Sequence, residues 1–226
     1  MKITGLINRL AVLSVLAVFS AAAHAVPVVL TFEGLQNQEQ ILDFYNGGTG
    51  SLGSAGPNVG VAFGTGALAL IDADAGGGGN FANEPSADTV AFFLNQSSLT
   101  MNVAAGFDTG FSFFYTSSTA ATINVWSGLN GTGVILGSLN LIAQHTANGC
   151  TGDPTGTFCN WDAIGVAFGG TAMSVVFGGT ANQTAFDEIT LFSDTPGQQV
   201  PEPGTLALLG LGLAGLGLSR RRRAKK

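Results

Sequence analysis

Lysine and arginine are missing from the long central part of this 226-residue sequence, residues 26–199. All 8 of them lie near the two ends of the chain, and His145 is the one histidine of the central part. Proteins hold nucleic acids, nucleotides and phosphorylated molecules mainly with Lys and Arg. The central part is therefore a poor candidate for binding these anionic molecules, and we expect no nucleic-acid partner.

Carboxylates are common in the same central part. Of the 14 Asp and Glu residues, only Glu202 lies outside it. A buried carboxylate there has no Lys or Arg to pair with, so it must be protonated, hydrogen-bonded or bound to a metal ion. Calcium prefers carboxylate and carbonyl oxygens and is the candidate cofactor. The alternative is that the acids are solvated and keep the domain soluble, which we expect for most of them.

Cysteine is scarce, because Cys150 and Cys159 are the only two. A short loop that contains Gly and Pro separates them, and in an oxidising compartment such a pair forms a local disulfide. Structural zinc normally takes four Cys or His ligands, and the central part offers only His145 besides this pair. The pair therefore predicts a disulfide rather than a zinc or redox site.

Signatures of catalysis are also missing. The sequence has no G-x-S-x-G motif, and the neighbours of His145, Gln144 and Thr146, show no nucleophile signature. Many carboxylate pairs exist, but no spacing singles out one pair for glycoside hydrolysis. We therefore expect no enzymatic activity.

The central part shows no helical period, and its pattern predicts an all-β fold. Short apolar or alternating runs recur, with Gly, Asn, Ser and Asp between them, which is typical of an antiparallel β-sandwich or jelly roll. We expect this domain over residues 26–195. The expected strands are residues 28–32, 67–71, 89–94, 99–103, 110–115, 122–126, 134–142, 172–177 and 186–192.

One long acidic loop, residues 72–88, has the composition of a cation site. Asp72 and Asp74 alternate, flexible glycines follow, and Glu84 comes later. The loop is not an EF-hand, because the bidentate glutamate at its twelfth position is absent. A calcium site formed by Asp72, Asp74 and Glu84 is one interpretation, and a plain acidic surface loop is the other.

A second carboxylate pair lies at the two ends of the domain. Glu33 follows the first expected strand, and Asp187 is the second residue of the string FDEITL in the last one. This string resembles the final strand of calcium-stabilised jelly-roll carbohydrate-binding modules, and the resemblance implies that Glu33 and Asp187 share a structural calcium. Strand alternation places Asp187 on the face of Ile189 and Leu191, and Glu188 on the face of Phe186 and Phe192. Alternation alone does not decide which face is buried.

Two tryptophans are candidates for stacking against a sugar ring. Trp161 lies between Asn160 and Asp162, just beyond the predicted disulfide, and Trp126 shares one strand face with Thr122 and Asn124. Packing into the core is the more common role of tryptophan and is the alternative for both.

The composition of both ends of the chain is typical of targeting signals. Lys2 and Arg9 precede an apolar run, and Ala23-His24-Ala25 forms a small-x-small cleavage site, so we expect a helical signal peptide over residues 1–25, removed by signal peptidase. At the other end, a linker (196–203) leads into a hydrophobic helical membrane segment (204–219). A basic tail (220–226) follows.

Three elements follow one another in the C-terminal part: the triplet Pro201, Glu202 and Pro203, the apolar run, and the stop-transfer residues Arg220, Arg221, Arg222 and Arg223. In this order they resemble the PEP-CTERM sorting signal of exopolysaccharide-producing Gram-negative bacteria. The resemblance implies recognition by the membrane enzyme exosortase, which removes the tail. About 14 apolar residues make a helix of roughly 21 Å, shorter than the ~30 Å hydrocarbon core, which suits transient residence in the inner membrane. A permanent C-terminal anchor is the alternative.

These observations predict an exported β-sandwich protein that reaches the cell surface or an extracellular matrix, with a structural or adhesive role. A lectin-like module that binds extracellular polysaccharide is the first alternative, and a polysaccharide-acting enzyme is the second.

The sorting interpretation makes a direct prediction. Because exosortase would cut near Pro201–Pro203, the protein recovered outside the cell should lack the arginines at 220–223 and residues 1–25. Intact-mass measurement of the extracellular protein checks this. A mass that includes the basic tail would contradict it.

Overall fold

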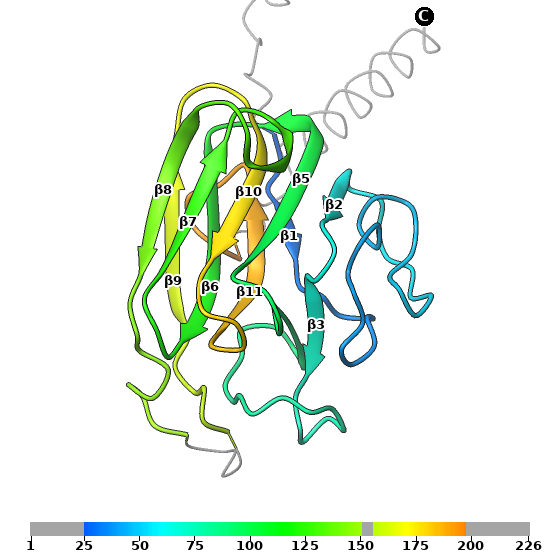
Figure 1. The fold of residues 1–226 in the computed structure, drawn as a ribbon, viewed down its shortest axis with the longest axis vertical. Helices are drawn as coiled ribbons and strands as arrows, with labels where there is room; N and C mark the ends of the chain where they lie inside the picture. The colour runs from blue at the N-terminus through cyan, green and yellow to red at the C-terminus, as the bar shows by residue number, and fades with distance from the viewer. Residues whose placement is uncertain (1–24, 151–155, 198–226) are drawn as a thin grey trace, which may run out of the picture.

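The computed structural model describes residues 25–150 and 156–197, and these form an all-β domain. Two antiparallel sheets pack face to face, one behind the other in Figure 1, so the predicted β-sandwich is confirmed. Within this described part, no helix has the length and hydropathy that a membrane crossing requires. The expected signal peptide (apart from residue 25), sorting motif, membrane segment and basic tail lie outside the described residues.

The larger sheet contains six strands. Its order is β3 (Leu68–Ile71), β4 (Thr89–Phe92), β11 (Thr184–Leu191), β6 (Gly110–Ser117) and β9 (Asp162–Ala167), and β1 (Val28–Leu30) also pairs with β11. Strand β11 is central, because β4, β6 and β1 all pair with it. The end of the domain is therefore bound directly to its beginning.

The smaller sheet has five strands. Its order is β2 (Val61–Phe63), β5 (Ser98–Phe107), β10 (Ala172–Gly178), β7 (Ala121–Trp126) and β8 (Ile135–Leu141). A short 3-10 turn, η1 (Leu129–Gly131), connects β7 to β8. Each of the nine expected strands overlaps one strand of the structure, and the sequence prediction missed only β2 and β9.

Phenylalanine rings fill the space between the sheets. Phe177 of β10 contacts Phe186 of β11 across the sandwich with ring centroids 4.8 Å apart, and it also contacts Phe113 of β6 at 5.7 Å. All three side chains are fully buried. Because side chains alternate along a strand, the neighbouring residues lie on the outer faces of the sheets. On the outer face of the six-stranded sheet they form a second, smaller cluster around Phe81, Val90, Phe92 and Ala185.

Candidate functional site

Two loops that are distant in the sequence cover the outer face of the six-stranded sheet. Phe81 and Phe158 form a parallel bridge, in which the Ala82 amide donates to the Phe158 carbonyl at 3.1 Å. The amides of Thr157 and Phe158 donate to the Asn80 carbonyl at 2.6 and 3.1 Å. The Trp161 indole N–H donates to the Ala82 carbonyl at 3.1 Å and closes the contact. The two loops therefore form one hydrogen-bonded unit over the sheet.

Further contacts hold the second of these loops, residues 156–161. Cys150 and Cys159 form the predicted disulfide, which is thereby confirmed. The amides of Cys159 and Asn160 both donate to the His145 carbonyl, at 2.7 and 3.0 Å. The buried Gln144 amide donates to the carbonyls of Tyr115 and Asn160 at 3.0 and 3.3 Å. This loop is therefore held to β6 as well as to the 80–83 loop.

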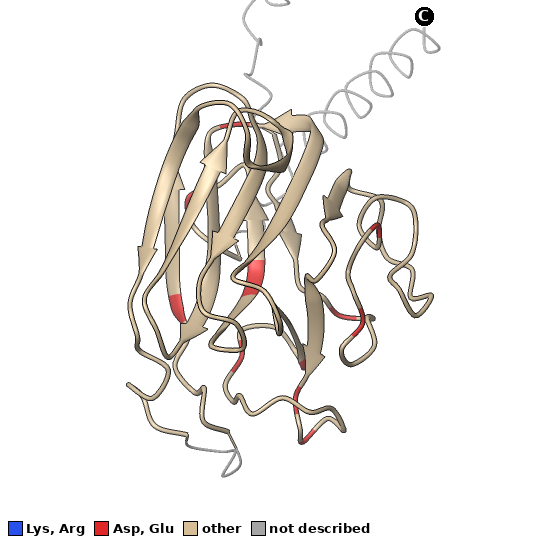
Figure 2. Ribbon diagram, viewed as in Figure 1, with Lys and Arg blue, Asp and Glu red and all other residues tan. Residues whose placement is uncertain are grey.

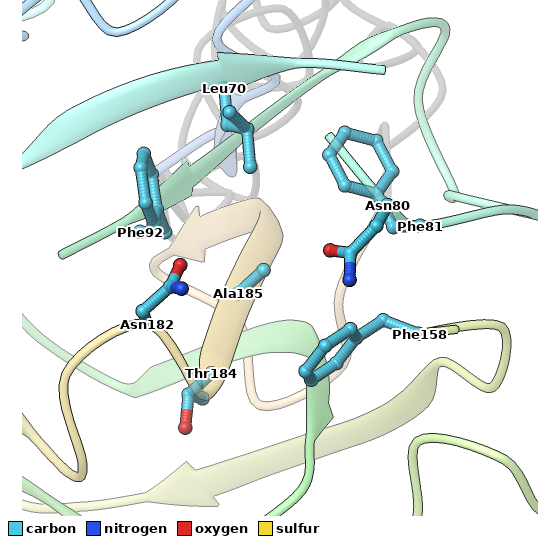
Figure 3. Close-up of a pocket in the computed structure, with 8 residues that line it drawn as sticks. All are labelled: Leu70, Asn80, Phe81, Phe92, Phe158, Asn182, Thr184 and Ala185. Carbon is cyan, nitrogen blue, oxygen red and sulfur yellow. The ribbon is translucent and has the colours of Figure 1, made fainter. Parts of the chain in front are cut away.

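A shallow pocket lies where the two loops meet the sheet (Figure 3). Aromatic side chains form much of its wall, and amide and hydroxyl side chains accompany them. The lining residues are Leu70, Asn80, Phe81, Phe92, Phe158, Asn182, Thr184 and Ala185. Its volume of about 20 Å³ holds one or two water-sized groups. A larger ligand would therefore rest on the pocket and insert only a small group.

Two asparagines give the pocket its polarity. Figure 3 shows the Asn182 amide near the Phe92 ring, and within the described residues this side chain forms no hydrogen bond. The Asn80 amide lies between the Phe81 and Phe158 rings and donates to the Thr157 hydroxyl at 2.7 Å. The Thr184 hydroxyl is already hydrogen-bonded to Ser117 at 2.7 Å. Asn182 is therefore the polar group most available to a ligand.

The two predicted tryptophans lie in different places. Trp161 is half-buried beside the pocket cluster, with its ring edge-on to Phe81 at 6.2 Å. Trp126 lies on the opposite sheet, half-buried, and its indole nitrogen is buried without a hydrogen-bond partner in the described residues. Ile123 and Val125 of the same strand face the core. The structure therefore does not bring the two tryptophans into one site.

Sequence reasoning missed the pocket residues themselves. Phe81 and Phe158 are the large apolar side chains of loops that are otherwise rich in Gly, Asn, Thr and Ala. An aromatic residue in such a loop was the available signal, because a loop side chain of that size needs a surface to pack against. Their pairing depends on a bridge between positions 77 residues apart, which no local pattern shows.

Glu33 and Asp187 both bind the end of the acidic loop. The Asp187 carboxylate is fully buried and accepts hydrogen bonds from the Ser86 amide and hydroxyl, each at 2.7 Å, and from the Glu188 amide at 2.7 Å. Glu33 accepts from the amides of Asp88 and Thr89 at 3.0 and 2.9 Å. The two carboxylates therefore hold the chain segment 86–89 between them.

A bulge in β11 changes the expected strand alternation. The pairing register shifts between Asp187 and Thr190, and Glu188 has a φ of 45°, in the left-handed region. Ile189 therefore joins Phe186 in the main core, while Asp187 lies on the other face with Ala185. The prediction that Asp187 shares a face with Ile189 and Leu191 is wrong for this reason.

The other predicted metal ligands lie around one open depression. Asp72, Asp74 and Glu84 line it together with Asp88, and Figure 2 shows the Asp and Glu residues of the domain in red. Burial, followed by repulsion from the three aspartates, raises the pKa of Glu84 to about 7. Among the described residues, no three His, Cys, Asp or Glu side chains are grouped closely enough to hold a metal ion. Calcium binding stays a prediction.

Comparison with known proteins identifies the C-terminal signal. Residues 199–223 match the PEP-CTERM protein-sorting motif, so the predicted sorting signal is confirmed. The comparison with curated proteins gave no match.

Several solved structures are similar over part of the chain. A family 29 carbohydrate-binding module from Piromyces equi is 9% identical, with 73% of this chain and 88% of that chain covered and a TM-score of 0.37. The module CBM6cm-2 of Cellvibrio mixtus lichenase 5A is 12% identical, with 56% and 86% covered and a TM-score of 0.34. A glycoside hydrolase family 43 arabinoxylan arabinofuranohydrolase from Bacillus subtilis is 19% identical, and 55% of this chain covers only 24% of that enzyme at a TM-score of 0.36. At these TM-scores the likenesses carry no argument about the site.

The buried Asp187 predicts a pH dependence of stability. Burial raises its pKa from 3.8 to about 7, although its three hydrogen-bond donors act in the opposite direction. The folded state therefore holds a proton that the unfolded state releases near pH 4, and stability falls as the pH rises from about 4 to about 7. In Asp187→Asn stability should depend less on pH. Between pH 4 and pH 7 the free energy of unfolding of the wild type should fall by about 2–4 kcal/mol more than that of the variant.

Urea unfolding measured from pH 4 to pH 8 checks this difference. The amide of the variant replaces at most one carboxylate oxygen as acceptor, so a uniform loss of stability at all pH values is also expected. Parallel profiles for the two proteins would contradict the assignment.

The calcium prediction is checked by thermal unfolding at pH 8. If a cation neutralises the carboxylates that line the depression, calcium should raise the midpoint of thermal unfolding of the wild type by about 3–6 °C relative to chelator. Glu84→Gln should unfold at a higher temperature than the wild type without calcium, because the repulsion is reduced, and it should respond less to calcium. Superimposable curves with calcium and with chelator would contradict the prediction.

Proposed function

We propose that this PEP-CTERM protein is a non-enzymatic surface or matrix protein whose β-sandwich binds uncharged polysaccharide at the pocket between the 80–83 and 156–161 loops. The sorting motif at residues 199–223 implies export and a surface or extracellular location. The binding function rests on the pocket, and the structural or adhesive role follows from holding polysaccharide at the cell surface.

The observation that carries the proposal is the mixed character of the pocket. Phe81, Phe92 and Phe158 offer apolar surface of the kind that packs against the C–H face of a sugar ring. Beside them, the Asn182 amide supplies both a donor and an acceptor for sugar hydroxyls. Apolar walls with a few placed polar groups are the usual composition of a small-molecule site.

The charge of the domain favours an uncharged ligand. Figure 2 shows no Lys or Arg in the described domain, so an anionic sugar would find no basic side chain there. The lining residues of the pocket are themselves uncharged. A neutral polysaccharide loses much less hydration energy on binding to such a surface than a charged one, which would also leave its charge unpaired.

The size of the pocket suggests how a sugar unit would bind. About 20 Å³ is too small for a ring, but it accommodates a hydroxymethyl group or the methyl of an acetyl substituent. The ring would then lie over the half-buried Phe158. Such a contact is weak for a single sugar and gains strength when many copies bind one long chain.

The targeting signals complete the proposal. Signal peptidase would remove residues 1–25, exosortase would cut near Pro201–Pro203, and the short apolar segment would hold the protein in the inner membrane between the two events. This sequence of steps is supported by the confirmed sorting motif and by the length and composition of the two terminal segments.

Two substitutions test the pocket without disturbing the fold. Asn182 has a φ of 57°, which glycine adopts freely, so Asn182→Gly removes the amide without backbone strain. Phe158→Leu removes the ring but keeps an apolar side chain. Each should weaken binding to soluble neutral glucans and to insoluble cellulose about ten-fold, measured by affinity electrophoresis and co-sedimentation.

Phe168→Leu is the matched control. Phe168 is also half-buried, but it packs on Phe107 at the far end of β9 from the pocket. This variant should bind like the wild type. Wild-type binding that survives both pocket substitutions would contradict the site. Cleavage of cell-derived polysaccharide would favour an enzyme, and no binding to any polysaccharide would leave the purely structural role.

A further inference from the structure

The fold leaves one sheet edge open and uncharged. In the described residues β8 pairs only with β7, so its other side presents unpaired backbone N–H and C=O groups. Figure 1 shows β8 at the outer margin of the five-stranded sheet, and Figure 2 shows no acidic residue on it. Residues 129–142 contain no charged side chain and no proline. Charged side chains and proline are the features with which proteins normally protect an edge strand, so β8 lacks this protection.

The chain protects other edges with its own backbone. On the open side of β3, the amides of Gln38 and Ile41 donate to the carbonyls of Ala69 and Ala67 at 2.8 and 3.0 Å. On the open side of β2, the Phe63 amide donates to the Leu42 carbonyl at 2.8 Å. The long N-terminal segment between β1 and β2 therefore covers both edges.

The edge of β9 differs from that of β8 in its side chains. Strand β9 begins with Asp162, and its aliphatic side chains Ile164 and Val166 are packed against the main core. Around β8, in contrast, large apolar side chains remain exposed: Val134 by 68%, Ile135 by 45% and Ile142 by 64%. Open backbone groups and exposed aliphatic side chains therefore coincide at β8.

We propose that β8 pairs antiparallel with β8 of a second copy of this chain, centred on Leu139, so that two five-stranded sheets form one continuous sheet. A bulge at Leu136 bends the start of the strand, and Gly137–Leu141 is regular. Centring on Leu139 uses this regular part completely. It places Ser138 opposite Asn140 of the other copy, both exposed on the outer face.

The charge distribution of the domain favours a second copy of this chain as the partner of the β8 edge. The domain has 13 carboxylates in residues 26–199 and no Lys or Arg, so two copies repel each other wherever acidic loops meet. The β8 edge lacks this repulsion. The Ser138 hydroxyl donates to Asn124 of its own copy at 2.7 Å and keeps an acceptor for the Asn140 amide of the other copy. A basic protein partner would instead be drawn to the acidic loops. Strand addition of this kind draws its affinity from main-chain hydrogen bonds.

Single cysteine variants of the full chain test the pairing in detergent-solubilised membranes. In the proposed register position 138 faces position 140 of the other copy, at a separation that a disulfide spans. A mixture of Ser138→Cys and Asn140→Cys proteins should therefore form a disulfide-linked dimer. Each variant alone is the matched control, because identical positions are then about 7–8 Å apart on a diagonal and should cross-link weakly. Non-reducing electrophoresis with peptide mass mapping gives the result.

A second measurement removes the dependence on cysteine chemistry. In sedimentation velocity the wild-type full chain should shift to a dimer as its concentration rises, and Ser138→Lys/Asn140→Lys should stay monomeric over the same range, since lysines on an edge oppose strand addition. Equal cross-linking in all three cysteine samples overturns the proposal. So does cross-linking of one variant alone above the mixture, or dimerisation that the lysine variant retains.

Discussion

The hydrogen bonds that buried carboxylates accept from backbone amides hold this domain together where no basic side chain is available. Glu39 is completely buried; burial acts to raise its pKa, but the donors from Gln36, Leu52 and Ser54 outweigh this effect and the pKa is lowered. Asp187 also accepts hydrogen bonds from Ser86, although there burial outweighs the donors and raises the pKa. Glu39 joins segments 13 and 15 residues apart, and Asp187 joins segments 101 residues apart. Backbone amides thus replace the missing Lys and Arg.

The candidate pocket depends on the same bonds. Asp187 and Glu33 fix the segment 86–89, which leads directly into β4, and β4 supplies Phe92 to the pocket wall. The acidic loop begins at Asp72 and includes Phe81, so its two ends are set by carboxylate contacts and its middle by the bridge to Phe158. An acidic domain can therefore present an uncharged site, because its buried carboxylates are occupied with internal hydrogen bonds.

The strands could be predicted from the sequence because a sandwich buries one face of each strand, which imposes alternation over five or more residues. Strand β2 has only three residues in a glycine-rich region, and β9 is partly exposed along its length, so neither shows a clear pattern. The face of Asp187 was predicted wrongly because a left-handed residue, Glu188, breaks the alternation. The pocket escaped prediction because its two loops meet only in the folded chain.

The proposed pocket and the proposed edge are compatible in one molecule because they belong to different sheets. The pocket lies on the outer face of the six-stranded sheet, whereas pairing through β8 extends the five-stranded sheet. A dimer formed at β8 would therefore keep both pockets open to solvent. Two weak sites in one rigid dimer bind a long polymer much more tightly than one site does, provided that the polymer spans them. Weak single-sugar affinity and a matrix role are then consistent with each other.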